Sequence, residues 1–260
     1  MSKELAGKTI LVTRSREQAS PLVSLLEQEG ATVLVQPVIE IKPPVDWSLC
    51  DHLLSDLSVC DWLVFSSQNG VHYFFERFLQ KYGPTFDCGN HLRDFGIRIA
   101  AMGPATAAAV GQYNAFVDCV PEKYCAEGMI AALTAEARQR KRFVLVRGDR
   151  GRQILSEELI RLGGTVSQVS VYRSIDIMQP DENVYRLMQT GKIDAVTVTS
   201  SAIANSLLNL FGDMLAFTKI ISISPLTSAV LTITGLPIDQ EATTASIDSL
   251  VAAAKKAFEE

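Results

Sequence analysis

Short apolar runs rich in valine and isoleucine alternate along this chain with segments whose apolar positions recur at the helical period. Such runs indicate strands buried on both faces, and the segments between them indicate helices covering a parallel sheet. The predicted strands lie near residues 8–14, 32–37, 61–66, 97–102, 116–120, 142–147, 165–172, 194–199, 219–223 and 237–241. The predicted helices lie near residues 16–29, 69–82, 104–112, 126–138, 151–162, 182–190, 201–211, 225–233 and 246–258. The pattern therefore predicts an α/β fold.

The first part of the pattern occurs twice. Residues 8–78 match residues 141–211 without a gap, at a constant offset of 133 positions. The match includes Gly30-Ala31-Thr32-Val33 over Gly163-Gly164-Thr165-Val166, and Phe65-Ser66-Ser67 over Val198-Thr199-Ser200. The chain is therefore expected to form two similar units, and a cleft between such units commonly holds a large ligand.

Two ways of assigning the chain to these units fit the repeat. Proline-containing stretches near 36–44 and 170–180 are typical of connecting strands. In a tandem arrangement the domains are residues 1–140 and 141–260. In a crossed arrangement residues 38–171 form one domain, and the N-terminal unit joins the C-terminal third of the chain. The periodicity leaves both open.

Composition narrows the function classes. The chain has 260 residues, 47% of them hydrophobic, and a net charge of −5, which argues against a nucleic-acid-binding protein. Its five cysteines form no C-x-x-C pair and sit in or beside apolar stretches, which is typical of reduced packing residues. No apolar run approaches the roughly 18 residues that span a bilayer, so we expect no membrane association and a cytoplasmic protein.

Hydroxyl, amide and arginine side chains follow the predicted strands where helices begin. Carboxyl ends of parallel strands form the binding edge of a sheet, and helix N-termini there attract carboxylates and phosphates. Each hydroxyl taken alone is typical of an ordinary helix N-cap. Arg14 and Arg147 occupy equivalent positions of the repeat, where arginine opposes the helix dipole and an anionic ligand would favour it. The candidate residues are Arg14, Ser66, Ser67, Asn69, Thr106, Arg147, Thr199, Ser200, Ser224 and Thr227.

Other kinds of chemistry lack candidates. The three histidines share no metal-ligand spacing with each other or with the cysteines, so no metal site is expected. The chain has no G-x-S-x-G elbow and no G-x-G-x-x-G turn. Gly148-Asp149-Arg150-Gly151-Arg152 is glycine-rich but lacks the length and the ending of a P-loop.

These residues together resemble the uroporphyrinogen-III synthase family over nearly all of residues 8–258. The resemblance rests on Val12-Thr13-Arg14, Phe65-Ser66-Ser67-Gln68-Asn69-Gly70-Val71, Met102-Gly103-Pro104-Ala105-Thr106-Ala107, Arg147-Gly148 with Gly151-Arg152, Val171-Tyr172-Arg173, Val198-Thr199-Ser200 and Ala245-Ser246-Ile247-Asp248-Ser249-Leu250. One departure is Ser224-Pro225-Leu226-Thr227, where the family usually has a glycine at the position of Ser224. That departure affects the expected backbone contacts of a ligand at this turn.

The resemblance implies the crossed arrangement. One α/β domain would comprise residues 1–35 and 177–260, the other residues 38–171, each with a parallel sheet flanked by helices. A two-stranded connector would join them, and the active site would lie in the cleft between them. The resemblance implies no metal and no organic cofactor. It also implies a monomer without nucleic-acid or membrane partners, and leaves open a transient contact with the preceding pathway enzyme.

The implied reaction closes linear hydroxymethylbilane into uroporphyrinogen III while inverting ring D through a spiro intermediate, a step of tetrapyrrole biosynthesis. The substrate carries eight carboxylates, which suit the hydroxyls, N–H groups and arginines at the strand ends. Tyr172 is the candidate catalytic acid that the resemblance implies. Taken alone, it is more typical of a packed linker aromatic than of a catalytic acid.

Two other classes remain as alternatives: a non-enzymatic two-domain α/β ligand-binding protein, and a flavodoxin-like flavin-binding module. Ser66-Ser67-Gln68-Asn69 resembles a hydroxyl-rich phosphate loop, which favours the second. A yellow purified protein would support a flavin-binding function.

Overall fold

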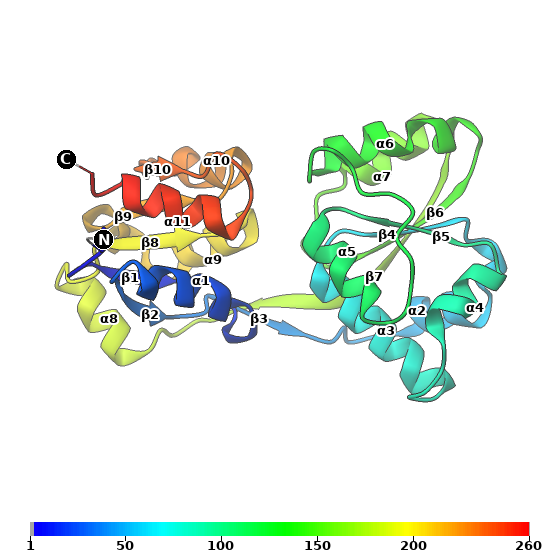
Figure 1. Ribbon diagram of the computed structural model, residues 1–260, viewed down its shortest axis with the longest axis horizontal. Helices are drawn as coiled ribbons and strands as arrows, with labels where there is room; N and C mark the ends of the chain where they lie inside the picture. Colours follow the sequence, from blue (N-terminus) through cyan, green and yellow to red (C-terminus); the bar gives the residue numbers. More distant parts are fainter. Residues whose placement is uncertain (1–2, 260) are drawn as a thin grey trace. The chain divides into compact units, whose positions relative to one another are not determined.

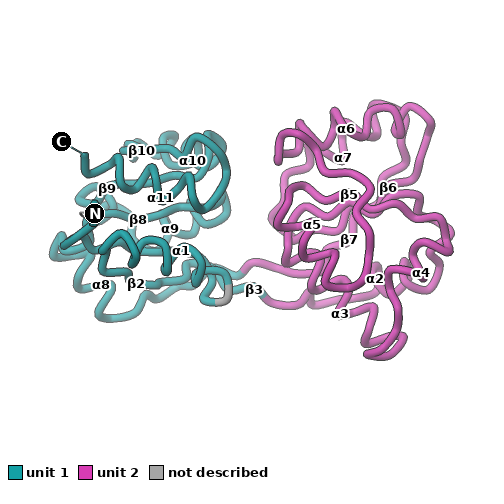
Figure 2. The backbone as a smooth tube through the Cα atoms, viewed as in Figure 1, with its two compact units in different colours: residues 1–41, 175–260 teal, residues 42–174 magenta. Residues whose placement is uncertain are grey.

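The computed structural model describes residues 3–259 and divides the chain into two compact units (Figures 1 and 2). Unit 1 comprises the residues up to Ile41 and those from Ile175 onward, and unit 2 comprises Lys42–Ser174. Each unit contains parallel strand pairs with helices on both faces, so the predicted α/β fold class is confirmed.

Within residues 3–259, unit 1 has a five-stranded sheet in the order β10-β9-β8-β1-β2. Its strands are β1 (Thr9–Val12), β2 (Thr32–Val35), β8 (Ala195–Val198), β9 (Lys219–Ser222) and β10 (Gln240–Glu241). Its helices are α1 (Arg16–Gln28), α8 (Glu182–Gln189), α9 (Ser201–Phe211), α10 (Pro225–Ile233), α11 (Ile247–Lys256) and the 3-10 helix η2 (Gly212–Phe217).

The second sheet, again counted over residues 3–259, has the order β3-β7-β6-β4-β5. Its strands are β3 (Ile39–Lys42), β4 (Trp62–Phe65), β5 (Arg98–Ala101), β6 (Arg142–Gly148) and β7 (Thr165–Asp176). The helices of unit 2 are α2 (Ser48–Ser55), η1 (Leu57–Val59), α3 (Gln68–Tyr82), α4 (Cys88–Asp94), α5 (Pro104–Gly111), α6 (Ala126–Arg138) and α7 (Ile154–Arg161).

The chain passes between the units along β3 and along β7, which are neighbours in the second sheet. These passages fall inside the stretches 36–44 and 170–180. Strand β1 pairs in parallel with β8, from Ile10 opposite Ala195 to Val12 opposite Thr197. This pairing puts the N-terminal strands in one sheet with strands from the C-terminal third of the chain.

The repeat is visible in the elements and continues with a second offset. β1, β2 and α9 begin 133 positions away from β6, β7 and α3. β5, α5 and α6 begin at residues 98, 104 and 126, and β9, α10 and α11 begin 121 positions later. The difference of twelve residues falls in the part of unit 2 that contains α4. The two sheets therefore share a four-strand pattern, β9-β8-β1-β2 in unit 1 and β5-β4-β6-β7 in unit 2. The fifth strand differs, because β10 extends the first sheet beside β9 and β3 extends the second beside β7.

Alternation along the strands builds a core on each sheet face. In β6, Val144 and Val146 pack with the phenylalanines of α3, whereas Phe143 and Leu145 pack with α6 and α7. In unit 1, α1 and α11 cover one face, and α8, α9 and α10 cover the other. No helix in residues 3–259 is long and apolar enough to cross a membrane.

Four aspartates bind the amino ends of strands in matched pairs. Each accepts a hydrogen bond from a backbone N–H of another segment, at 2.7 or 2.8 Å. The bonds run to Asp61 from Arg142, to Asp194 from Thr9, to Asp118 from Ile99 and to Asp239 from Ile220. The equivalent positions of the repeat thus keep equivalent contacts.

The strand prediction for residues 116–120 is wrong. Only Cys119 forms an isolated bridge there, with Ala100. Phe116 and Val120 are exposed, so their apolar pattern does not reflect a buried strand face. The predicted helix 151–162 is also too long at its start, because the structure begins α7 at Ile154.

The short helices α2 and α4 were not predicted. Helix α2 has two turns, with Cys50, Leu53 and Leu54 buried, and α4 has only seven residues. Seven residues, as in α4, are too few to define a helical period.

Candidate active site

The carboxyl end of β4 leads into the site of unit 2. Ser66 is exposed, and Ser67 is the N-cap of α3, where its hydroxyl accepts the N–H of Gly70 at 3.1 Å. Serine is favoured there because its oxygen satisfies a helix N–H that lacks an intrahelical partner. The same Oγ lies 3.1 Å from the phenolic oxygen of Tyr172. A helix cap and a tyrosine from β7 thus meet at one point.

Tyr172 is half-buried and enclosed on several sides. Its ring stacks on Tyr73 with the ring centres 6.1 Å apart. It also occupies the space beside Gly148, where an added Cβ would lie 2.5 Å from ring carbons of Tyr172.

Burial raises the pKa of Tyr172 above its ordinary value of 10, and the charge of Asp149 acts in the same direction. The hydrogen bond with Ser67 and the charge of Arg147 oppose this rise in pKa. The phenol is therefore protonated at neutral pH and can donate a proton.

Arg147 lies on the other face of β6. It follows Phe143 and Leu145 in the alternation, on the side of α6 and α7, and its exposed fraction is 8%. Its Nη1 donates to Gln168 Oε1 at 2.6 Å and to the carbonyl of Arg152 at 3.1 Å. Burial lowers the pKa of its guanidinium. Among residues 3–259, its Nη2 has no hydrogen-bond partner.

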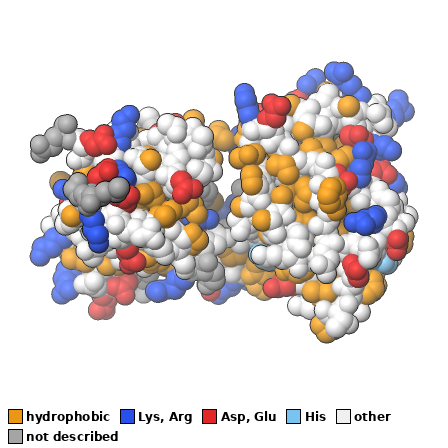
Figure 3. Space-filling model, in the orientation of Figure 1, with side chains coloured by type: hydrophobic (Ala, Val, Ile, Leu, Met, Phe, Trp, Pro, Cys, Tyr) orange, Lys and Arg blue, Asp and Glu red, His pale blue; other side chains and the backbone are white. Residues whose placement is uncertain are grey.

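Three more residues of unit 2 lie near this edge. Thr106 is buried in the first turn of α5, and Asn69 is half-buried in the first turn of α3. Tyr124 is not among the residues predicted from the sequence, and its side chain lies 3.5 Å from the position of a Cβ added to Gly103. Tyr124 is 53% exposed. Figure 3 shows hydrophobic side chains gathered on one face of unit 2.

The equivalent edge of unit 1 carries Arg14 after β1. Its guanidinium donates to Gln18 Oε1 at 3.3 Å, and burial lowers its pKa. The neighbouring Thr13 is fully buried and donates to the carbonyl of Thr197 at 2.7 Å. This bond joins β1 to β8 and fixes the strand end from which Arg14 projects.

Two serine caps complete the edge of unit 1. Ser200 follows the half-buried Thr199 and caps α9 by accepting the N–H of Ile203 at 3.2 Å. Ser224 caps α10, and its hydroxyl lies 3.1 Å from that of the buried Thr227. Ser224 has φ −166°, an extended conformation open to any residue, so serine replaces the family glycine there without backbone strain.

Metal and thiol chemistry have little support in the described residues. No group of three or more His, Cys, Asp or Glu that could hold a metal ion occurs in residues 3–259. Burial raises the pKa of Cys50 and Cys60 to about 12 and that of Cys88 to about 11. These thiols are protonated at neutral pH, which makes them poor nucleophiles.

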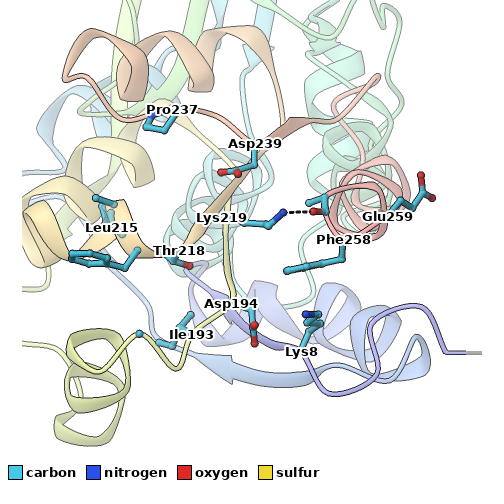
Figure 4. Close-up of a pocket in the computed structure, with 14 residues that line it drawn as sticks. Lys8, Ile193, Asp194, Leu215, Thr218, Lys219, Pro237, Asp239, Phe258 and Glu259 are labelled. Carbon is cyan, nitrogen blue, oxygen red and sulfur yellow. Dashed lines mark hydrogen bonds between the residues drawn. The ribbon is translucent and has the colours of Figure 1, made fainter.

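A separate pocket of about 550 Å³ lies at the amino ends of the strands of unit 1 (Figure 4). Lys8, Asp194, Lys219 and Asp239 are among its lining residues. Both aspartates bind strand N–H groups, and both lysines lie over the ring of Phe258, with Nζ 4.8 and 5.1 Å from its centre. These contacts stabilise the fold, and the pocket lies at the edge opposite to the candidate residues.

Comparison with known proteins gives one consistent family. The family model described as Uroporphyrinogen-III synthase HemD matches residues 20–252. The uroporphyrinogen-III synthase of Chlorobaculum parvum is 27% identical over 236 residues, covering 89% of this chain and 92% of that protein. That of Synechococcus elongatus is 30% identical over 215 residues, covering 81% of this chain and 77% of that protein.

A solved structure has the same fold. A mutant uroporphyrinogen III synthase from Thermus thermophilus aligns with a TM-score of 0.64 and 18% identity, covering 96% of this chain and 98% of that one. The comparisons favour the enzyme prediction over the ligand-binding and flavodoxin-like alternatives.

Proposed function

Because the chain belongs to the uroporphyrinogen-III synthase family, we propose that Tyr172 is the acid with which it cyclises hydroxymethylbilane to uroporphyrinogen III. The family resemblance drawn from the sequence is confirmed, and with it a role in tetrapyrrole biosynthesis. The single observation that supports the proposed acid is the protonated, half-buried phenol 3.1 Å from the Ser67 hydroxyl.

The reaction begins when the C–O bond of the terminal hydroxymethyl group breaks. Electrons from the adjoining pyrrole nitrogen expel the oxygen, and the phenol of Tyr172 supplies the proton with which it leaves as water. Ring D attacks the resulting azafulvene through its substituted carbon, which forms the spiro intermediate. The intermediate fragments and closes in the inverted sense. The proton released when the last ring regains aromaticity restores the phenol.

Most of the catalytic effect comes from control of conformation, since unassisted closure gives the type I isomer. The enzyme must hold the chain so that ring D presents its substituted carbon, and must keep water from the azafulvene. We propose that the capped helix starts and Arg14 bind substrate carboxylates. Helix N-termini and guanidinium groups both favour such anions.

In unit 1 the proposed binding groups are Arg14, Thr199, Ser200, Ser224 and Thr227. In unit 2 they are Ser66, Asn69 and Thr106. Ser67 both caps α3 and contacts the acid. Arg147 is buried on the other face of β6, and its contacts with Gln168 and with the turn after β6 support a positioning role.

The function is tested with the full chain and hydroxymethylbilane generated enzymatically in the same vessel. The products are oxidised, and the type I and type III isomers are separated and quantified. The proposal predicts that type III predominates and forms faster than type I does without the enzyme. Type I product alone, at the uncatalysed rate, would contradict the function.

A further inference from the structure

The turn after β6 packs directly against Tyr172. Gly148 is paired with Tyr172 in the sheet, at a register shift between Arg147 and Gly148. A Cβ added at Gly148 would lie 2.5 Å from the ring carbons Cε2 and Cζ and 2.9 Å from the phenolic oxygen. Real Cβ atoms essentially never approach this closely, so any side chain at Gly148 would displace the ring. The phenol reaches Ser67 only because residue 148 is a glycine.

Asp149 holds the backbone on both sides of the same tyrosine. Its N–H donates to the carbonyl of Tyr172 at 3.2 Å, and its carboxylate accepts the N–H of Ser174 at 3.0 Å. A single residue therefore binds β7 at position 172 and again two residues later. This arrangement limits the rotation and shift of the strand segment that carries the phenol.

Arg147 supports the turn from the opposite face. Its Nε donates to the carbonyl of Gly148 at 3.3 Å, and its Nη1 donates to the carbonyl of Arg152 at 3.1 Å. A Cβ added at Gly151 would lie 2.2 Å from Nη2, so the turn closes directly over the guanidinium. Burying this cation is unfavourable, and the backbone carbonyls and Gln168 offset part of that cost. Its contacts fix the shape of the turn from residue 148 to residue 152.

From these contacts we infer that Arg147, Gly148 and Asp149 are positioning residues, which set the Tyr172 phenol against Ser67 and toward the departing hydroxyl. The inference rests on the proposed role of Tyr172 as the acid. Gly148 supplies the space for the ring, Asp149 holds its backbone, and Arg147 holds the turn that carries both. None of the three exchanges a proton with the substrate.

The decisive variant is Gly148→Ala. A misplacement of about 1 Å can lower a rate on the order of 10²-fold, so kcat should fall by about that factor while KM stays nearly constant. Gly89→Ala is the matched control, because its Cβ would lie 2.0 Å from the Asn114 carbonyl in the same unit, away from Tyr172. Both variants are assayed at a temperature below the midpoints of their thermal unfolding. Gly89→Ala should be less stable but keep the wild-type kcat.

A double-mutant cycle separates positioning from general damage. In a Tyr172→Phe background the phenyl ring still meets the added methyl group, so Gly148→Ala should lower stability as before. It should have almost no further effect on kcat, because no proton donor remains to be misplaced. A loss of kcat by the same factor in both backgrounds would overturn the inference.

Asp149→Ala provides a second test if Gly148→Ala fails to fold, because it adds no atoms. It should lower kcat several-fold with KM nearly unchanged. Wild-type kcat in both Gly148→Ala and Asp149→Ala, together with a slow Tyr172→Phe, would overturn the positioning roles and leave the proposed acid intact. Wild-type kcat in Tyr172→Phe would overturn the acid and the inference together.

Discussion

The carboxyl-end edges of the two sheets share a framework but differ in the side chains placed on it. Ser67 and Ser200, 133 positions apart, cap α3 and α9 in the same way. The buried strand-end residues differ: unit 1 has Thr13, Thr197 and Ser222 where unit 2 has Val146, Val64 and Ala101. The turns and caps are thus common to both units, whereas the strand ends are specialised.

The edge of unit 2 alone has a phenol beside its cap. Position 39 of unit 1, which is equivalent to Tyr172 in the repeat, is the buried Ile39. Unit 1 instead has the half-buried Arg14 and hydroxyl pairs such as Ser224 with Thr227. This difference suggests that unit 2 supplies the proton, whereas unit 1 mainly binds carboxylates.

Tyr172→Phe should have the largest effect, because it removes the proton donor and keeps the ring against Tyr73. General acid assistance contributes about 10² to 10⁴ in rate, so kcat should fall by a factor in that range. The unfolding midpoint should stay nearly unchanged, and more type I product should form. Tyr113→Phe, which removes a hydroxyl 3.1 Å from His72 in the same unit, should keep the wild-type kcat. Steady-state kinetics with isomer analysis test both.

Arg14→Ala should come next and should act on binding. A charge-assisted hydrogen bond contributes about 1.5–3 kcal/mol, so KM should rise about 10- to 150-fold while kcat changes little. Arg161→Ala is the control, because Arg161 pairs with Glu158 on the exposed surface of α7. An unchanged KM in Arg14→Ala would show that unit 1 does not bind the substrate through this residue.

Thr13→Val tests the buried hydroxyls of unit 1. The change keeps the volume, gives unit 1 the residue type of Val146, and removes the bond to the Thr197 carbonyl. The free energy of unfolding should fall by about 1 kcal/mol in denaturant titrations. Equal free energies of unfolding for wild type and variant would mean that the Thr13 hydroxyl does not stabilise the edge of unit 1.

Asp61→Asn tests the aspartate contacts at the opposite edge. Hydrogen bonds from Arg142 lower the pKa of Asp61 from 3.8 to about 2. Because the folded-state pKa is depressed, the stabilisation is present above pH 3.8 and is lost as the pH falls through 2. The variant should be less stable at neutral pH by about 1 kcal/mol or less, since the pair is partly exposed. The free energy of unfolding is measured for both proteins between pH 2 and pH 3.8. If it changes with pH in Asp61→Asn as steeply as in the wild type, this assignment is contradicted.

The repeat, the parallel sheets and most helix boundaries could be predicted from the sequence. Helices α6, α9 and α10 have the predicted bounds, because each combines a polar or small N-cap with a long apolar period. The caps Ser67, Ser200 and Ser224 could be proposed for the same reason. The crossed arrangement could not be chosen from periodicity, because strand pairing between β1 and β8 joins residues far apart in the sequence.

The role of Arg147 could not be predicted either. Its position matches that of Arg14, but the register shift after it and the glycine at 151 place its guanidinium under the turn. The contact between Gly148 and Tyr172 depends on the same shift. A signal was present in the glycines at 148 and 151, since glycines in a turn often mark a close approach of other atoms. Sequence spacing alone did not identify those atoms.

The kinetic comparison of Ser67→Gly with Ser200→Gly tests the division of labour between the two edges most directly. Glycine is itself tolerated at an N-cap, so each change should lower stability by only a few tenths of a kcal/mol. Loss of the hydroxyl beside the phenol, about 1 kcal/mol, should lower kcat about fivefold in Ser67→Gly with little change in KM. Ser200→Gly should raise KM and keep kcat. If both variants change the same kinetic parameter by the same factor, the two edges have the same function. That result would contradict the proposal that unit 2 supplies the proton and unit 1 binds carboxylates.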